Sequence, residues 1–401
     1  HLCGRRPAPR RASLCALTEC SGKIIDHAIV LWFPGPGSFT GEDAAELHLH
    51  GGRAVLRDVA ACLVTLGLRP AEHGEFSRRA FLNGRLDLTE AEAIADLVDA
   101  ETTAQRRQAL RQMDGSLGTL LGGWATTLTT LLAQQEALID FPDEDLPPEV
   151  EAALDAAMRQ LLGEMRAHLD DGRRGERLRE GLVFAVLGAP NAGKSTLVNA
   201  LAQRDIAIVS PLPGTTRDVL EARIDLGGVP VTLLDTAGLR EAADDIEAEG
   251  MRRARHRAAA ADAVILLESP TEPAPTSVAD HQLTIRVATK ADLRDPQALD
   301  LPGQIQVSVR TGQGMAALLE CLASHATALT HTEGPPPLTR ARHRAALLEA
   351  TDRLDQACTA PHPELRAEDL RLALRALGRI TGRVGVEEIL DSVFHQFCIG
   401  K

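Results

Sequence analysis

Tyrosine is absent from this chain of 401 residues, and lysine occurs only four times. Arginine therefore supplies almost all of the positive charge. A lysine retained against that background is expected where a compact ammonium is needed and a planar guanidinium does not fit. Lys194 and Lys290 lie in two of the motifs described below, and Lys401 is the last residue.

Cysteine pairs, long apolar runs and excess positive charge are also missing. The seven cysteines are scattered and form no CxxC pair, which excludes a disulfide framework and a cysteine-based zinc site. No apolar run approaches the roughly 20 residues that span a bilayer, so we expect no membrane span and a cytoplasmic location. The net charge of −13 excludes a protein that coats nucleic acid by charge alone.

The hydrophobic patterns along the chain predict several domains, and the length suits two to four. Short apolar runs between residues 25 and 50, followed by helical periodicity over 53–68, predict a small α+β domain. From Leu182 onward, continuous apolar runs alternate with helical segments, as in a buried parallel α/β sheet. Helical periodicity lies on both sides of that part. The expected boundaries are 1–83 for the α+β domain, 84–180 and 333–401 for the two parts of a helical domain, and 181–332 for an α/β domain inserted into it.

A phosphate-binding loop is predicted at Gly188–Ser195, which fits the pattern GxxxxGK[ST]. The motif follows a predicted strand and opens a predicted helix, which is the context it requires. Lys194 would reach the β and γ phosphates, and the Ser195 hydroxyl would bind Mg²⁺. The residues expected to bind the triphosphate here are Asn191, Ala192, Gly193, Lys194, Ser195 and Thr196.

The next apolar strand ends in a DxxG motif. Asp235 would hold Mg²⁺ through water, and the Gly238 N–H would sense the γ phosphate. Between the two motifs, Thr216 is the threonine expected to complete the Mg²⁺ shell in switch I. The DxxG residues expected at the nucleotide are Asp235, Thr236, Ala237 and Gly238.

A third motif predicts guanine as the base. Asp292 can accept two hydrogen bonds from guanine, whereas adenine offers the wrong pattern. The more usual asparagine is replaced by Thr289, which is expected to weaken one tie to the phosphate loop. The residues expected around the base are Thr289, Lys290, Ala291 and Asp292, with Ser308, Val309 and Arg310 behind it. The α/β domain is therefore predicted to be a P-loop, Ras-like G domain.

The origin of catalysis is less obvious from the motifs. Ras-type enzymes place a glutamine after DxxG to orient water, but Leu239 stands there. Arg217 and Arg240 are nearby candidates for an arginine finger. The acidic stretch 241–249 offers a carboxylate, although most of it reads as a solvated loop.

These motifs and several further runs resemble the bacterial tRNA modification GTPases of the MnmE (TrmE) family over nearly the whole chain. The terminal CIGK together with the FPGP and SFTGED runs is highly specific. The runs that carry the resemblance are Leu31–Pro36, Ser38–Asp43, Gly74–Ser77, Arg79–Asn83, Asp87–Ile94, Ile139–Pro142, Pro190–Leu197, Gly214–Leu220, Asp235–Glu241 and Phe397–Lys401.

The resemblance implies an N-terminal folate-binding and dimerising domain ahead of the helical and G domains. It implies a homodimer that works with the flavoprotein MnmG in a heterotetramer. Together they would add an aminomethyl-type group to C5 of the wobble uridine of certain tRNAs. The one-carbon unit would come from 5-formyltetrahydrofolate or a related tetrahydrofolate.

Carried over position by position, the resemblance also implies site residues. Lys194, Asn191 and Glu247 are the implied catalytic residues, Glu247 by positioning water. K⁺ would replace the arginine finger, held by Asn191, Ser210, Leu212 and Thr215. The folate site would comprise Glu46, Arg85 and Lys401. Cys398 is the family's terminal cysteine, for which a functional thiol and a packed apolar thiol remain equal readings.

The chain departs from the family pattern in places. A first strand and helix, including a folate-binding arginine, would lie ahead of His1, which leaves dimerisation and folate affinity open. Two prolines stand in the K⁺-binding stretch, and Arg85 replaces a common lysine.

Two other classes of protein share part of this pattern. An Era-like ribosome-assembly GTPase would need a basic RNA-binding module beside the G domain, and the flanks are helical and mixed in charge. A folate-binding scaffold with a vestigial G domain is disfavoured by the intact motif residues Lys194, Ser195, Thr216, Asp235 and Asp292.

Overall fold

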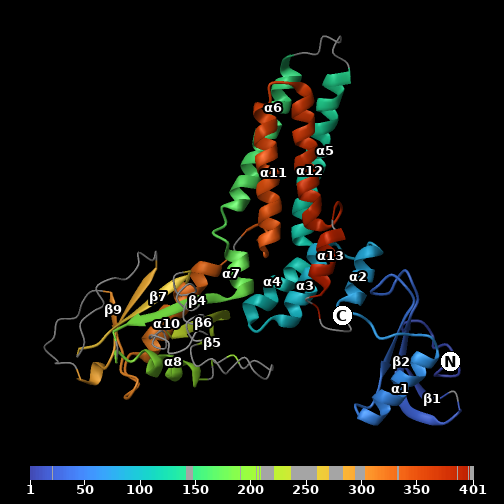
Figure 1. Ribbon diagram of the computed structural model, residues 1–401, viewed down its shortest axis with the longest axis horizontal. Helices are drawn as coiled ribbons and strands as arrows, with labels where there is room; N and C mark the ends of the chain where they lie inside the picture. The colour runs from blue at the N-terminus through green and yellow to red at the C-terminus, as the bar shows by residue number, and fades with distance from the viewer. Residues whose placement is uncertain are drawn as a thin grey trace, which may run out of the picture. The chain divides into compact units, whose positions relative to one another are not determined.

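The fold is given by a computed structural model (Figure 1). It describes residues 1–19, 21–140, 148–189, 191–204, 206, 208, 221–235, 260–270, 283–293, 303–331, 334–385, 387–395 and 397. The chain forms two compact units. Unit 1 comprises His1–Ala95, Gln112–Arg159 and Glu349–Lys401, and unit 2 comprises Asp96–Arg111 and Gln160–Leu348.

Unit 1 begins with a small antiparallel sheet in the order β1 (Ser13–Thr18), β2 (Ile24–Phe33) and β3 (Ala44–His48), followed by α1 (Arg53–Thr65). Its core includes the inward side chains of Leu17, Val30 and Val59. The predicted α+β character is confirmed. Strand β1 was not predicted, although its residues alternate between exposed and buried as a half-buried strand requires.

The helices of unit 1 have a regular apolar seam. The inward residues of α5 (Ser116–Asp140) are spaced by four and three residues in turn, the period that keeps one helix face on a partner. They are Leu117, Leu121, Trp124, Leu128 and Leu131. This helix packs along α12 (Pro363–Thr381), as Figure 1 shows.

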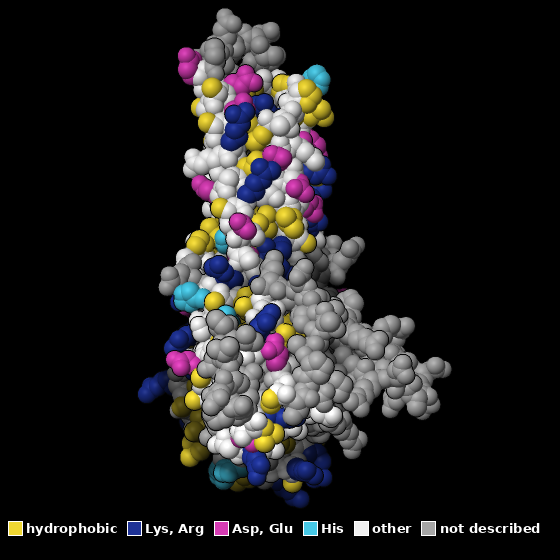
Figure 2. Space-filling model, turned by 90° about the vertical axis from the view of Figure 1, so that its left-hand side faces the viewer, with side chains coloured by type: hydrophobic (Ala, Val, Ile, Leu, Met, Phe, Trp, Pro, Cys, Tyr) yellow, Lys and Arg dark blue, Asp and Glu magenta, His cyan; other side chains and the backbone are white. Residues whose placement is uncertain are grey.

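The chain also forms the helices α2 (Glu75–Leu82), α3 (Leu88–Asp99), α4 (Thr103–Met113), α6 (Pro148–Leu169), α11 (Ala341–Thr359) and α13 (Glu387–Phe394). On the face shown in Figure 2, acidic and basic side chains are interspersed rather than gathered by sign. Within the part of the chain that the structure describes, no helix is both long and apolar enough to cross a membrane.

Unit 2 is built on a six-stranded sheet in the order β5-β6-β4-β7-β8-β9. The strands are β4 (Leu182–Gly188), β5 (Glu221–Leu226), β6 (Val229–Asp235), β7 (Ala263–Glu268), β8 (Thr284–Ala288) and β9 (Gln304–Gln306). The pairs β6/β4, β4/β7, β7/β8 and β8/β9 are parallel, as predicted. The helices α8 (Lys194–Ala202) and α10 (Met315–Thr330) pack on this sheet.

Strand β5 corrects the expectation of an entirely parallel sheet. It pairs antiparallel with β6 through a tight turn at Gly227 and Gly228. Both glycines have positive φ, at 67° and 93°, which a two-residue hairpin turn of this kind requires. A Gly-Gly pair between two apolar strands was a readable signal of this hairpin.

The α/β part of the chain is inserted between two helical segments. The chain enters it from α7 (Arg174–Glu180) and leaves it towards α11. The entry and exit segments are packed together, because a Cβ at Gly175 would lie 2.4 Å from the Leu338 carbonyl oxygen. Arg344 pairs with Asp171 and Glu176, each at 2.6 Å. The predicted fold class is confirmed, including the insertion.

Candidate nucleotide-binding site

The predicted nucleotide motifs meet at one edge of the sheet in unit 2. The loop 188–195 follows β4, Asp235 ends β6, and residues 289–292 follow β8. All three strands are parallel, so their carboxyl ends lie on the same side. This edge is where open α/β sheets bind their ligands.

The backbone of the loop after β4 has the shape of an anion-binding nest. Asn191 and Gly193 have φ values of 63° and 95°, and Gly193 caps the N-terminus of α8. A Cβ built on Gly193 meets nothing within 4 Å, whereas one on Gly188 would lie 2.8 Å from the Leu267 carbonyl oxygen. Successive N–H groups in such a turn, aimed from a helix N-terminus, suit a phosphate.

Lys194 lies inside this loop with only 7% of its surface exposed. Its Nζ donates to the carbonyl oxygens of Gly188 and Ala189 at 2.9 and 2.8 Å. A buried ammonium needs such partners or an anion, so the charge is held beside the nest. Ser195 and Thr196 are exposed on the first turn of α8.

Asp235 ends β6 directly beside the phosphate loop. It is 6% exposed and stands opposite Val186 of β4 in the parallel register. Its carboxylate and the Ser195 hydroxyl are oxygen donors of the kind that Mg²⁺ prefers. The donor set of the described residues therefore fits a magnesium ion.

Thr289 is tied to the phosphate loop. Its hydroxyl donates to the Ala192 carbonyl oxygen at 2.7 Å, and its N–H donates to the carbonyl of Glu268 at the end of β7. The sequence predicted a weakened tie at this position because asparagine is usual there. In the structure, the threonine hydroxyl supplies a bond that the sequence alone did not reveal.

The Thr289→Val variant should lower the free energy of unfolding of the α/β domain by about 1–3 kcal/mol, because the buried Ala192 carbonyl loses its hydrogen-bond donor. Calorimetric unfolding would measure the effect. Thr284→Val, at an exposed position on β8, is the matched control. Equal stability of the two variants would contradict this role of Thr289.

The residues predicted to recognise the base lie together after the end of β8. The Ser308 hydroxyl donates to Asp292 Oδ1 at 2.7 Å. This hydrogen bond, helped by the positive charge of Arg310, holds the pKa of Asp292 below its ordinary value. Asp292 is itself exposed, and the Ala291 N–H is bound to the Val307 carbonyl. Lys290, which lies between Thr289 and Ala291 in the chain, has a positive φ of 54°.

The Ser308→Ala variant should make GTP binding more sensitive to acid. Asp292 must be ionised to accept two hydrogen bonds from guanine. Since Ser308 lowers its pKa, the variant's pKa returns towards the ordinary value, and affinity is lost at a higher pH as the solution is acidified. Fluorescence titration across pH 3–7 measures this, and an unchanged pH profile would refute the assignment. At pH 7, where the Asp292 carboxyl is ionised in both proteins, loss of the bond that orients it should weaken binding about two- to tenfold.

The residues implied for folate lie in unit 1. Glu46 is exposed on β3, with its carboxylate 3.4 Å from His48 Nε2. Arg85 is exposed, and its Cγ would lie 3.2 Å from a Cβ at Gly41. Among the described residues, no hydrogen bond or ion pair joins Glu46 to Arg85.

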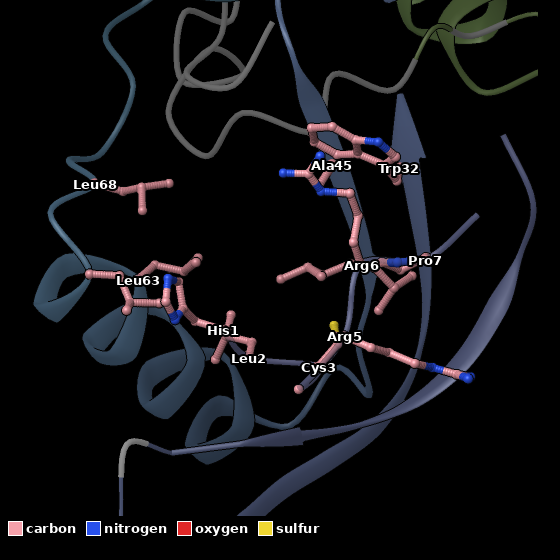
Figure 3. A pocket seen from close by; sticks show the side chains of 14 residues that line it. His1, Leu2, Cys3, Arg5, Arg6, Pro7, Trp32, Ala45, Leu63 and Leu68 are labelled. Atoms are coloured by element: carbon pink, nitrogen blue, oxygen red, sulfur yellow. The ribbon is translucent and has the colours of Figure 1, made fainter. Parts of the chain in front are cut away.

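A cavity of about 750 Å³ lies elsewhere in the N-terminal domain, between α1, the sheet and the first seven residues (Figure 3). The guanidinium of Arg6 lies 5.2 Å from the centre of the Trp32 ring at its wall. Ala45 and Leu47 line the cavity, whereas Glu46 between them belongs to the opposite face of the strand. The cavity is therefore separate from the Glu46 surface.

Several predicted site residues lie outside the described residues. They are Ser210, Leu212, Thr215, Thr216, Thr236, Ala237, Gly238, Glu247, Cys398 and Lys401. The predictions made for them remain predictions.

Comparison with known proteins places the N-terminal domain and the rest of the chain in one family. The family model described as the MnmE helical domain matches residues 88–398, and that described as the GTP-binding protein TrmE N-terminus matches residues 1–85. The tRNA modification GTPase MnmE of Gluconacetobacter diazotrophicus is 60% identical over 100% of this chain and 92% of its own length. The protein of the same name from Granulibacter bethesdensis is 57% identical with the same coverage.

A solved structure of Era in complex with MgGDPNP and a 16S ribosomal RNA fragment is a much more distant match. It is 22% identical, covers 43% of this chain and 66% of its own, and has a TM-score of 0.28. A likeness of that size carries no argument about function.

Proposed function

The chain belongs to the MnmE (TrmE) family of tRNA modification GTPases, and on that premise we propose that it hydrolyses GTP and modifies tRNA. In detail, it would act with a flavoprotein of the MnmG type to add an aminomethyl-type group to C5 of the wobble uridine of certain tRNAs. The one-carbon unit would come from a tetrahydrofolate. The Era-like alternative is not favoured, because the family models match residues 1–85 and 88–398.

One observation carries the GTP part of the proposal. The nest at Asn191 and Gly193, the buried Lys194 and the Asp292–Ser308 pair lie at the same sheet edge. The first two groups suit a triphosphate, and Asp292 suits guanine. A site built on such hydrogen bonds rejects adenine because its own polar groups would be left unpaired.

The residues around the phosphates would have separate roles in binding ions and in hydrolysis. Lys194 would neutralise charge on the β and γ phosphates. Ser195 and Thr216 would hold Mg²⁺, with Asp235 acting through water. Asn191, Ser210, Leu212 and Thr215 would hold K⁺, which when bound supplies positive charge near the phosphoryl group. Glu247 would orient the attacking water.

The folate site is proposed on donor chemistry. Glu46 offers a carboxylate that can accept from the N–H groups of a pterin, and Arg85 and Lys401 offer cations for carboxylates of the glutamate tail. Arginine at position 85 keeps the charge that lysine would bring. We further propose a homodimer, a heterotetramer with the flavoprotein, and a cytoplasmic location, with the domain boundaries at 83, 180 and 332.

The proposal is tested by reconstitution. The purified chain, a flavoprotein partner of the MnmG type, GTP with Mg²⁺ and K⁺, a tetrahydrofolate one-carbon donor, an ammonium salt as the source of the amino nitrogen and unmodified tRNA are combined, and the nucleosides are analysed by mass spectrometry. Modification at C5 of the wobble uridine is expected with GTP and not with ATP. The Lys194→Ala protein should lose modification and turnover together. Modification that proceeds fully with Lys194→Ala, or association with ribosomal RNA instead of tRNA, would reject the proposal.

A further inference from the structure

The solvent-facing side of α4 carries arginine and no carboxylate. Arg106, Arg107 and Arg111 are exposed, with Leu110 between the last two in the chain. The 11 residues of α4 include no aspartate or glutamate, although acidic residues outnumber basic ones in the whole chain, 56 to 43. The helix is therefore a local region of positive charge on an acidic protein.

The spacing of the arginines places them on one face of the helix. At about 3.6 residues per turn, positions 106, 107, 110 and 111 lie on one side. The other side holds the buried residues Gln105, Ala109 and Gln112. Arg107 and Arg111 are four residues apart, and like charges at that spacing destabilise a helix. A bound anion would relieve this repulsion, so the face suits a negatively charged partner.

The buried side of α4 is fixed by glutamine side chains. Gln105 and Gln108 donate to backbone carbonyls of α7, each at 3.0 Å, and Gln112 donates to the Thr89 carbonyl of α3 at 2.8 Å. The first turn of α4 also donates a backbone N–H to the turn between β5 and β6. Because these bonds hold the backbone, the arginines are presented from a fixed support.

Arginines on the neighbouring helix have carboxylate partners, whereas the two at the centre of α4 do not. Arg177 and Arg179 of α7 form ion pairs with aspartates at 2.9 and 2.8 Å. Within the part of the chain that the structure describes, neither Arg106 nor Arg107 forms an ion pair. A guanidinium has five N–H donors and no acceptor, so both side chains are available to a partner outside the chain.

The carboxylates closest to α4 in sequence lie beyond its two ends. Glu101, two residues before the helix, is already paired with Arg223 of β5 at 2.9 Å. Asp114 follows the last residue of the helix and is exposed. It lies about 10 Å along the helix axis from Arg107, a distance at which exposed charges are largely screened at about 0.1 M salt. The centre of the face therefore stays positively charged.

Phosphate is the anion that this face fits best. A guanidinium can form two parallel hydrogen bonds with a phosphate group, which makes arginine the preferred residue for nucleic-acid recognition. Several arginines on one helix face suit a chain of phosphates better than a single ion. A protein with a net charge of −13 repels a polyanion at long range, so RNA binding requires a local positive surface.

We propose that the exposed face of α4, formed by Arg106, Arg107 and Arg111, binds the phosphate backbone of tRNA. This inference rests on the proposed function, which supplies tRNA as the partner. Contacts to phosphate fix the position of a nucleic acid but do not read its sequence. The face would therefore hold different tRNAs equally well.

The test measures binding of fluorescently labelled, unmodified tRNA to the full chain over a series of salt concentrations. The double variant Arg106→Gln/Arg107→Gln removes two charges and keeps good helix formers. If each arginine neutralises one phosphate, the slope of log K against log salt should become shallower by about 1.4–1.8. Binding should then be roughly 25- to 60-fold weaker near 0.1 M salt, and the two proteins should converge towards 1 M.

The matched control is Arg375→Gln/Arg383→Gln, which removes the same charge from two exposed arginines on α12 and just after it. This control should keep nearly the affinity and the salt slope of the parent. GTP turnover and the midpoint of thermal unfolding should be the same in the parent and in both variants, because the four arginines lie outside the nucleotide site. If the two double variants lose tRNA affinity equally, net charge explains the loss and the proposal is overturned.

A second comparison separates this proposal from the proposed function. If Arg106→Gln/Arg107→Gln binds tRNA as tightly as the parent, the role of α4 is overturned while the proposed function stands. Loss of the flavoprotein by that variant, with tRNA binding intact, would assign α4 to a protein contact instead. If the parent does not bind tRNA even with the flavoprotein present, the proposed function fails, and the tRNA surface fails with it.

Discussion

The Asp292→Asn variant is expected to prefer xanthosine over guanosine nucleotides, with GTP affinity reduced by at least about 10³-fold. In the proposed site, the Asp292 carboxylate would accept two hydrogen bonds from the N–H groups of guanine. An asparagine amide replaces one acceptor by a donor, which opposes guanine and matches the carbonyl that xanthine has at that position. Competition of GTP, XTP and ATP against a fluorescent GDP analogue would measure the change.

The matched control is Asp170→Asn, an exposed carboxylate in the same unit outside the nucleotide site. It should leave the preference for GTP intact. If Asp292→Asn bound GTP as tightly as the parent, the base would be read elsewhere. Equal binding of ATP and GTP by the parent would refute guanine specificity altogether.

Potassium is expected to stimulate GTP turnover on the order of 10³-fold over sodium, and loss of the Asn191 side chain should abolish that stimulation. Leu239 cannot orient water, and an arginine finger contributes about this much where one is present. The transition state still gathers charge on the phosphoryl oxygens, so a cation must meet it. Asn191 offers a side-chain carbonyl oxygen in the phosphate loop, a ligand that suits a large monovalent ion.

The geometry of Asn191 decides which variant to use. Its φ is 63°, where alanine is strained and glycine is not. Asn191→Gly therefore removes the carbonyl while keeping the nest, and Asn191→Ala adds backbone strain. Both should lose the potassium effect, and Asn191→Gly should still bind GTP as the parent does. Asn199→Ala, exposed on α8, is the control.

A second variant distinguishes the role of the cation from that of the residue that orients water. Glu247→Ala should stop hydrolysis while leaving GTP binding and the affinity for K⁺ intact, because the role proposed for Glu247 is to position water. Turnover is measured in K⁺ and Na⁺ buffers of equal ionic strength. Equal rates of the parent in the two buffers would show that Asn191 only braces the loop, and attention would move to Arg217 and Arg240.

Local sequence patterns predict most of the strands of the G domain. Its strands β4, β6 and β7 are largely buried apolar runs, whereas β8 is buried at alternate positions and β9 is half-buried. Each motif follows one of these strands. The edge strand β5 was missed because its alternating residues lack such a run, and its partner is specified by the Gly227–Gly228 turn. Strand β1 was missed because a short strand has a weak pattern until its neighbour is known.

The amino-acid sequence by itself determined the position of the phosphate loop and the inserted order of the domains, and it predicted Asp292 as the residue that recognises guanine. These features depend on the spacing of residues within one stretch of chain, so glycine positions and hydrophobic periodicity are enough to predict them. Only the tertiary structure showed that the Thr289 hydroxyl donates to the Ala192 carbonyl and that the Ser308 hydroxyl donates to the Asp292 carboxylate. Each of these bonds joins residues that only the packing of strands and helices brings together. The same types of residue at the same spacing leave the partner open, because a hydrogen bond is set by distance and direction in space rather than by position along the chain.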